Sequence, residues 1–171
     1  ALSRLSAFSV FQAMLSCDIN KSFIHLSICG LLSGVTETTL TNSYTAKNRL
    51  TVMSLPHRKL SIVSMFYPNL MKNSITYITL FNTRSYFGPI IHQKSNLSLE
   101  NAYATSTALS VMALQPLTTT LDNMMTFQLK NSANNQSLSI KDINKKSYDQ
   151  AKKIPLDKCL NLMLLRTAWL G

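Results

Sequence analysis

The side chains that most often carry catalysis or metal binding are scarce in this chain of 171 residues. They are His25, His57, His92, Cys17, Cys29 and Cys159. No two histidines lie at a spacing that suits a shared metal ion, and the cysteines form neither a CxxC pair nor an even set for disulfides. No glycine-rich phosphate loop and no Ser-His-Asp order can be read. We therefore expect no enzyme activity, no metal site and no organic cofactor.

The charge balance is strongly positive. The chain has 17 Lys and Arg and 7 Asp and Glu, which gives a net charge of +10, yet only 14% of its residues are charged and 46% are hydrophobic. This combination is typical of a nucleic-acid-binding protein or of a membrane protein with basic loops. The positions of the charges must distinguish the two.

Three runs of the sequence are almost free of charge, and they predict the helices that must position any functional side chain. The runs are residues 101–121, 73–83 and 23–41. At ~1.5 Å per residue, a helix over 101–121 would cross a ~30 Å hydrocarbon core. The second run extends to residue 91 if Arg84 faces an internal cavity, and the third is interrupted only by His25 and Glu37. We expect an all-α membrane protein, with a soluble helical bundle as the rival because Ser and Thr keep the hydropathy modest.

Small residues in the stretch "GLLSGVTETTLTNSYTAKNRL" indicate a helix packed against other helices. Gly30 and Gly34 are four apart and therefore lie on one face, where they would permit close helix contact in lipid. Glu37 follows on the same helix. It either faces a cavity or makes an interhelical hydrogen bond. The basic residues that end the stretch mark the exit of the helix into water.

Basic residues gather in two segments, 47–59 and 141–158, which are predicted to lie on the same side of a membrane. The second segment, which contains Tyr148, is predicted to be a short amphipathic surface helix. Both segments would suit anionic lipid headgroups, cardiolipin included. RNA binding is the alternative, but it predicts aromatic residues among the basic ones for base stacking, and only Tyr148 qualifies.

The order of these segments resembles the mitochondrial carrier family. The stretches that carry the resemblance are "ALSRLSAFSVFQAML", "GLLSGVTETTLTNSYTAKNRL", "FYPNLMKNSITYITLFNTRSYFGPI", "LTTTLDNMMTFQLK" and "YDQAKKIPLDKCLNLMLLRTAWLG". The resemblance implies one carrier-like helical bundle over residues 1–171, comprising about helices two to six and a short matrix helix. Residues 1–20 would end helix two, 21–98 would form the second repeat, and 99–171 a truncated third repeat.

The family's gate motif, Pro-x-Asp/Glu-x-x-Lys/Arg, is eroded in this chain. In the second repeat it is similar to Asn42-x-Tyr44-x-x-Lys47 or, one residue along, to Ser43-x-Thr45-x-x-Asn48. In the third repeat it is similar to Thr120-x-Asp122-x-x-Met125, which keeps the acid but lacks the proline and the base. In the first register Tyr44 and Met125 replace an acid and a base that would have paired. The resemblance then implies that Lys47 and Asp122 seek partners on a first helix outside this chain.

If the chain were a transporter, the resemblance would place its solute site on the even-numbered helices. The implied substrate-binding residues are Arg166, Arg84, Thr76, Tyr77 and Thr79. Arg166 would bind an anionic solute such as a carboxylate or phosphate. The alternative interpretation of Arg166 is an arginine that reaches the lipid headgroups. The alternative interpretation of Arg84 is a charge at the cytosolic end of its own helix.

The resemblance, together with the eroded gate motif, implies an accessory or structural subunit of a respiratory or ATP synthase complex in the mitochondrial inner membrane. Its partners would be membrane lipids and other subunits, with no nucleic acid. An active carrier of a small anion is the first alternative, but alternating access needs a gate that forms and breaks. A basic protein associated with organellar ribosomes is the second alternative.

Overall fold

The structure is a computed structural model. It describes residues 22–55 and 65–133, together with Ser9, Ala13, Ser139, Lys141, Asp142, Lys145, Lys146, Asp149 and Lys153. The regular elements are α2 (Phe23–Val52), α3 (Phe66–Asn82), the π-helical turn η1 (Thr83–Phe87), α4 (Gly88–Lys94) and α5 (Leu99–Ala133). Every regular element in this described part is helical, so the predicted all-α class is confirmed there. Arg166 lies outside the described residues, as does most of the amphipathic helix predicted over 141–158.

Helix α2 is a single helix that covers the third predicted run and continues beyond it. It begins after Ser22, whose side chain accepts a hydrogen bond from the backbone N–H of His25 at 3.2 Å and so caps the first turn. It ends where the chain turns at Met53 and Ser54, and Ser54 has a φ of 54°. The backbone N–H of Leu55 then donates to the carbonyl of Leu50, which closes this end.

The next three elements follow one another without a break. Helix α3 passes into η1 and then into α4, and η1 inserts one wider turn into the helical path. Beyond it, Gly88 lies directly against the ring of Tyr103 on α5, where no Cβ would fit. Helix α5 begins directly after Ser98, whose side chain accepts a hydrogen bond from the backbone N–H of Asn101 at 3.3 Å and so caps the first turn.

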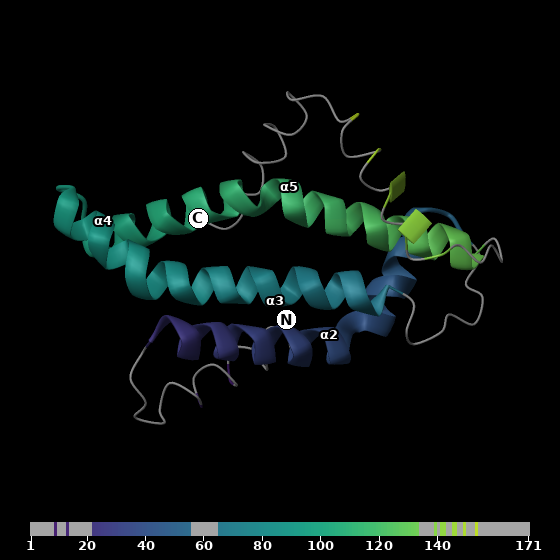
Figure 1. The fold of residues 1–171 in the computed structure, drawn as a ribbon, viewed down its shortest axis with the longest axis horizontal. Coiled ribbons are helices and arrows are strands. Elements are labelled where there is room, and N and C mark those ends of the chain that lie inside the picture. The colour runs from purple at the N-terminus through teal and green to yellow at the C-terminus, as the bar shows by residue number, and fades with distance from the viewer. Residues whose placement is uncertain are drawn as a thin grey trace.

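Helix α3 is the central element of the described residues. Figure 1 shows it between α2 and α5, while α4 lies beside the beginning of α5 at one end of the molecule. The core is divided between the two ends. The cluster near the beginning of α2 comprises Leu26, Cys29, Tyr77 and Phe81. The cluster near its end comprises Ala46, Leu50, Met65, Met125 and Leu129.

One helix in the described part of the chain, α2, is long and apolar enough to cross a membrane. The core helix of a soluble protein, which is mostly buried, and a signal sequence near the N-terminus pass the same test. In α2 only 33% of the apolar window is buried within the protein. Helix α5 includes the predicted run 101–121, yet it does not meet this criterion, because its many Ser and Thr residues lower the hydropathy.

Candidate functional site

The contact between α2 and α3 depends on two glycines. A Cβ added at Gly30 would lie 2.5 Å from the backbone nitrogen of Ile78, and one at Gly34 would lie 2.5 Å from the Cα of Ser74. Real Cβ atoms do not approach backbone atoms so closely, so only glycine permits this helix spacing. Gly30 and Gly34 therefore lie in the helix contact that the small-residue pattern predicts. Glu37, the third residue predicted for packing, is half-buried on α2.

Uncharged polar side chains connect the two helices along the same line. Asparagines of α3 donate to side chains of α2 at three levels: Asn82 to Ser27 at 3.0 Å, Asn73 to Thr38 at 3.0 Å and Asn69 to Asn42 at 3.2 Å. The α2 partners of the last two, Thr38 and Asn42, are buried. This line of glycines and side-chain hydrogen bonds is called the α2–α3 seam below.

The outer face of α2 has the opposite character, because it carries large apolar side chains that are exposed. They are Ile24, Ile28, Leu31, Leu32 and Val35, which lie within ~100° of one another around the helix. A helix in a water-soluble protein normally buries such residues and exposes its polar ones. In the first half of α2 the glycines face α3 and these large hydrophobic residues face outward, which suits contact with lipid, although Leu26 of the same segment is buried in the core.

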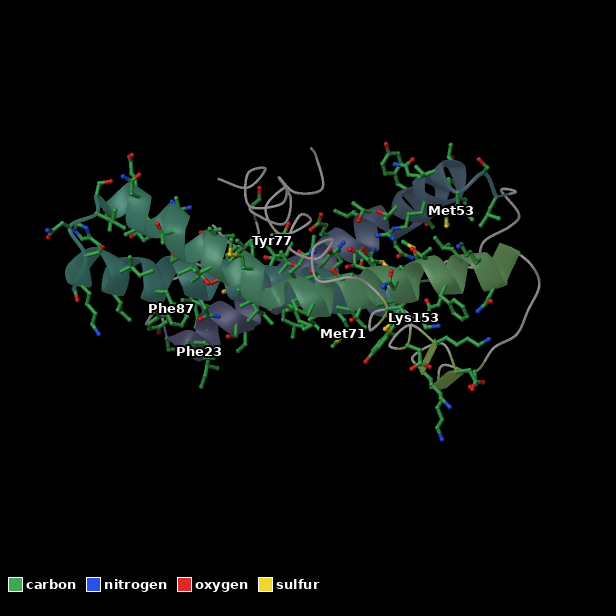
Figure 2. All side chains as sticks on the ribbon, turned by 90° about the horizontal axis from the view of Figure 1, so that it is seen from above. Phe23, Met53, Met71, Tyr77, Phe87 and Lys153 are labelled. Carbon is green, nitrogen blue, oxygen red and sulfur yellow. The ribbon has the colours of Figure 1, made fainter. Side chains whose placement is uncertain are left out.

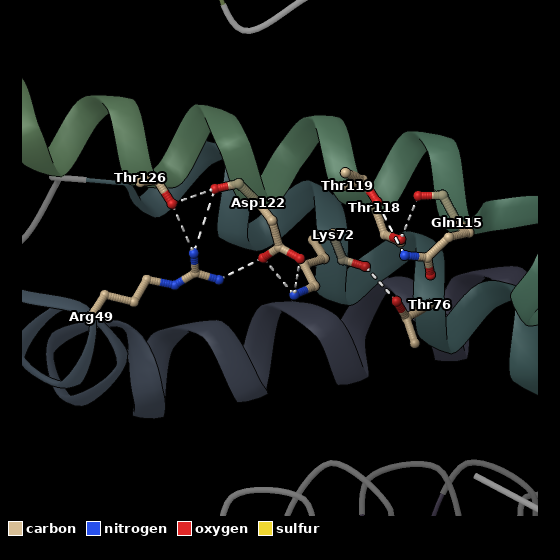
Figure 3. A network of polar contacts seen from close by, with 8 residues as sticks. All are labelled: Arg49, Lys72, Thr76, Gln115, Thr118, Thr119, Asp122 and Thr126. Carbon is tan, nitrogen blue, oxygen red and sulfur yellow. Dashed lines mark hydrogen bonds and ion pairs between the residues drawn. The ribbon is translucent and has the colours of Figure 1, made fainter. Parts of the chain in front are cut away.

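A charged cluster made of Arg49, Lys72 and Asp122 connects the three long helices at one end of the molecule. Figure 3 shows Arg49 of α2 and Lys72 of α3 meeting the carboxylate of Asp122 on α5. The Oδ1 atom of Asp122 lies 2.5 Å from Nη2 of Arg49 and 2.8 Å from Nζ of Lys72. Nζ of Lys72 also reaches Oδ2 at 3.0 Å. One carboxylate thus joins both neighbouring helices to α5.

The geometry of this charged cluster favours a structural role over proton transfer. Burial of Asp122 disfavours its charged form, but Lys72 and Arg49, through their charges and hydrogen bonds, outweigh that effect and hold the pKa of the carboxyl below its ordinary value. The carboxylate is therefore ionised at neutral pH and is a poor proton donor. Nη1 of Arg49 also donates to Oγ1 of Thr126 at 3.3 Å, which fixes the guanidinium on α5.

The residues predicted from the eroded gate motif lie in different environments. Asp122 pairs with Arg49 and Lys72 within the described chain, while a partner on a first helix outside this chain stays a prediction. Lys47 is exposed, and so is Tyr44, with 68% of its surface accessible. Met125 is fully buried in the core cluster near the end of α2, beside Met65 and Leu129.

The four described residues predicted to bind a solute are not brought together either, and the fifth, Arg166, lies outside the described residues. The Thr76 hydroxyl donates to the carbonyl of Lys72 on its own helix, and Tyr77 packs on Phe81 with ring centroids 5.6 Å apart. Thr79 lines a cavity on another side of α3. Arg84 is exposed and lies over the ring of Tyr103 at 5.9 Å, outside that cavity.

Sequence reasoning missed Arg49 and Lys72 as members of a site, although a signal was present. Lys72 directly precedes the charge-free run 73–83, and Asp122 directly follows the run 101–121. If the two runs are antiparallel neighbours, opposite charges at these positions meet at the same end. That inference requires knowledge of which helices are neighbours, and the sequence pattern of a single helix does not supply it.

Comparison of the chain with protein-family models, curated proteins and solved structures finds no match. The features that characterise this protein therefore come from its described residues alone. They form an antiparallel helical assembly with a glycine-containing seam, a charged cluster at one end and a long helix of apolar outer surface. No group of three or more potential metal ligands occurs among these residues.

Proposed function

We propose that the chain is a structural subunit embedded in a membrane by its helices. The observation that carries the proposal is the outer face of α2, which exposes Ile24, Ile28, Leu31, Leu32 and Val35 while Gly30, Gly34, Thr38 and Asn42 face α3. The 18-residue apolar window of α2 extends ~27 Å at ~1.5 Å per residue, close to the ~30 Å of a hydrocarbon core. In water such a continuous apolar surface would promote association.

The charged cluster fits this placement. Asp122 lies one residue beyond the charge-free run 101–121, and Arg49 lies in the last turn of α2, so both are outside the apolar segments. Lys72 borders the shorter run of α3, where its pairing with Asp122 offsets the cost of a cation close to lipid.

A structural role is favoured over transport because the polar groups of the described helices are used in holding helices together. Asn69, Asn73 and Asn82 bind α2, and Lys72 binds α5. The residues predicted for a solute site point in different directions from α3 and η1. No described arrangement offers a set of free cations around one cavity to an anionic solute.

The compartment and the partners in this proposal rest on the resemblance to the mitochondrial carrier family. In that view α2, α3 with its continuation, and α5 occupy the places of the third, fourth and fifth carrier helices. The membrane is then the mitochondrial inner membrane. Lipid headgroups, cardiolipin among them, and subunits of a respiratory or ATP synthase complex are the partners.

Charge placed on the outer face of α2 tests the membrane placement. Leu31→Lys introduces a cation near the middle of the apolar face, which costs ~3 kcal/mol at the centre of a membrane helix. Tyr44→Lys is the matched control, because Tyr44 is exposed on the same helix but lies beyond that face. We expect Leu31→Lys to reduce the fraction of the full chain that resists alkaline carbonate extraction by about tenfold or more, with no such loss for Tyr44→Lys.

Equal extraction of both variants and of the wild-type chain into the soluble fraction would contradict the membrane placement. The structural-subunit role is tested separately by native electrophoresis and mass spectrometry of detergent-solubilised mitochondrial membranes. Co-migration with a large respiratory or ATP synthase assembly at fixed stoichiometry is the expected result. A small free species would contradict the subunit role, and recovery with salt-washed ribosomes would contradict both parts of the proposal.

A further inference from the structure

Helix α2 reverses its pattern of burial part-way along its length. In its first half the exposed face carries large apolar side chains, and the residues buried against α3 include Gly34 and Thr38. Beyond Asn42 the buried residues are apolar, Ala46 and Leu50, and the exposed ones are mostly polar: Ser43, Tyr44, Lys47, Asn48, Thr51 and Val52. An apolar interior with a polar exterior is the pattern of a protein in water. The surface of α2 thus changes from one that suits lipid to one that suits water near Asn42.

Helix α5 shows the same reversal, and there it falls at Leu121. Before this residue the exposed positions include Leu109 and Leu117, while the buried ones are small or polar: Ala102, Ser106, Gln115 and Thr118. After it the buried residues are mostly apolar, namely Met124, Met125, Leu129 and Asn131, and Lys130 is exposed. Two long helices of the described chain therefore exchange a surface that suits lipid for one that suits water.

The two reversals lie at one level of the molecule. Ala46 of α2 and Met125 of α5 belong to the same core cluster. Asn42 and Leu121 each lie one turn before these residues, and Figure 1 shows that α2 and α5 run in the same direction. The 3.2 Å hydrogen bond from Asn69 to Asn42 adds α3 to this level. All three long helices thus share one transition.

We propose that the boundary between hydrocarbon and phospholipid headgroups crosses the helices at this level, so that the ends of α2 and α5 and the beginning of α3 project into the headgroup layer and the water beyond. This position of the boundary rests on the membrane placement proposed above. The thickness agrees, because ~20 residues at ~1.5 Å each, counted back from this level, cover a ~30 Å core and reach Ser22 before α2 and Asn101 near the beginning of α5. Figure 2 shows the projecting end at Met53, with Phe23 towards the opposite end of the molecule.

Two exposed tyrosines lie where the headgroup layer would be. Tyr44 and Tyr67 are each two residues beyond the hydrogen-bonded asparagine pair, on the projecting side, and are 68% and 60% exposed. Tyrosine is enriched at this depth of a membrane because its ring is apolar and its hydroxyl reaches water. Lys72 is three residues to the lipid side of Asn69, and its long side chain reaches back to Asp122. These side chains form a surface that fits phospholipid headgroups.

The test places one tryptophan at a chosen depth of the full chain, reconstituted in phosphatidylcholine vesicles. Trp169, the only tryptophan of the chain, is replaced by Phe in every variant. Four variants then add a tryptophan at an exposed position, where substitution has little effect on folding: Leu31→Trp, Tyr44→Trp, Tyr67→Trp and Val52→Trp. The fluorescence is quenched by lipids brominated near the glycerol, by lipids brominated near the chain end, or by iodide on both sides of the membrane.

The two reference variants fix the scale of depth. The tryptophan of Leu31→Trp, ~16 Å inside the boundary, should be quenched most by the deep bromines, and that of Val52→Trp, ~15 Å outside it, by iodide. We expect Tyr44→Trp and Tyr67→Trp to be quenched several-fold more by the shallow bromines than by the deep ones. The proposed boundary is overturned if either variant behaves like Leu31→Trp or like Val52→Trp, and deep quenching of Leu31→Trp would then still support the membrane placement. If brominated lipids quench none of the four variants, the membrane placement itself fails.

Discussion

The two faces of α3 are held by different physical means. Towards α2 it packs against Gly30 and Gly34, and the connecting side chains are uncharged amides and hydroxyls. Towards α5 it is connected by the Lys72–Asp122 ion pair at one end, and at the other end the hydroxyl of Thr83, in the adjoining η1, bonds that of Ser110. The α2–α3 seam is thus defined by backbone distance, and the α3–α5 contact by a few polar side chains.

This difference determines what each contact can tolerate. Backbone atoms held at van der Waals distance cannot move apart locally, so added volume in the α2–α3 seam must separate whole helices. A lysine or arginine side chain has several rotatable bonds and can adjust when a partner changes. We therefore expect substitutions in the α2–α3 seam to cost more than substitutions in the charged cluster.

The largest effect is expected for Gly34→Leu. A Cβ at this position would meet the backbone nitrogen and Cα of Ser74 at 2.5 Å, and three more carbons must then be accommodated. We expect the free energy of unfolding to fall by at least ~3 kcal/mol, at the upper end of overpacking costs. Denaturant unfolding of the full chain, followed by circular dichroism, measures this change.

Thr39→Leu is the matched control for Gly34→Leu. Thr39 is exposed on the same helix, so the added volume should change the free energy of unfolding by no more than ~0.5 kcal/mol. Equal stability of Gly34→Leu and Thr39→Leu would show that α2 and α3 are not in close contact, and the contrast between the two faces of α3 would be lost.

Asp122→Asn should have the next largest effect. It leaves the cations of Arg49 and Lys72 close together without the charge that both bind. Removal of one partner of a fully buried pair costs ~3–5 kcal/mol, but these side chains are 19–26% exposed, so we expect ~2 kcal/mol. The same unfolding experiment applies.

Lys72→Met distinguishes a shared carboxylate from a simple pair. Asp122 keeps Arg49 in this variant, so the loss should be ~1 kcal/mol or less and smaller than that of Asp122→Asn. A loss for Lys72→Met as large as that for Asp122→Asn would mean that Arg49 contributes nothing to the charged cluster.

Acid should weaken the α3–α5 contact selectively. The pKa of Asp122 is lowered on folding, so its contribution to stability is fully present above the unfolded value of ~3.9 and is lost as the pH falls through the folded value. We therefore expect the stability difference between the wild-type chain and Asp122→Asn to be constant from neutral pH down to ~pH 5 and to shrink below ~pH 4. A difference that does not depend on pH would contradict ionisation of this carboxyl in the charged cluster.

Much of the fold could be predicted from the sequence, because its strongest signals belong to single helices. The charge-free runs locate α2, α3 and α5, and the four-residue spacing of Gly30 and Gly34 identifies the packed face of α2. The length of α2 was underestimated, since the helix continues past residue 41 to Val52. Its polar last three turns carry no apolar signal, yet Ala46 and Leu50 pack into the core there.

The candidate site was harder to predict, because it depends on contacts between helices. Asp122 was identified from a motif whose other members did not assemble, and its partners were sought on a helix outside the chain. Arg49 resembles an ordinary residue of a basic segment until α2 is placed against α5. The cavity that Thr79 and Asn82 line is bordered by residues of α2, α3, η1 and α5, so no local pattern indicates it.

The smallest loss of stability is expected when a side-chain hydrogen bond of the α2–α3 seam is removed and its glycines are kept. Asn73→Leu removes the 3.0 Å bond to Thr38. The Thr38 oxygen accepts in this bond and loses its donor, but the O–H of Thr38 can still donate to the carbonyl four residues earlier, as the hydroxyls of Thr36, Thr39 and Thr41 do on the same helix. We therefore expect a loss of only ~0.6 kcal/mol, typical of a side-chain hydrogen bond between membrane helices. A double-mutant cycle with Thr38→Val measures the coupling directly, and a coupling above ~2 kcal/mol would mean that the hydrogen bonds, and not the close approach at the glycines, hold this face of α3.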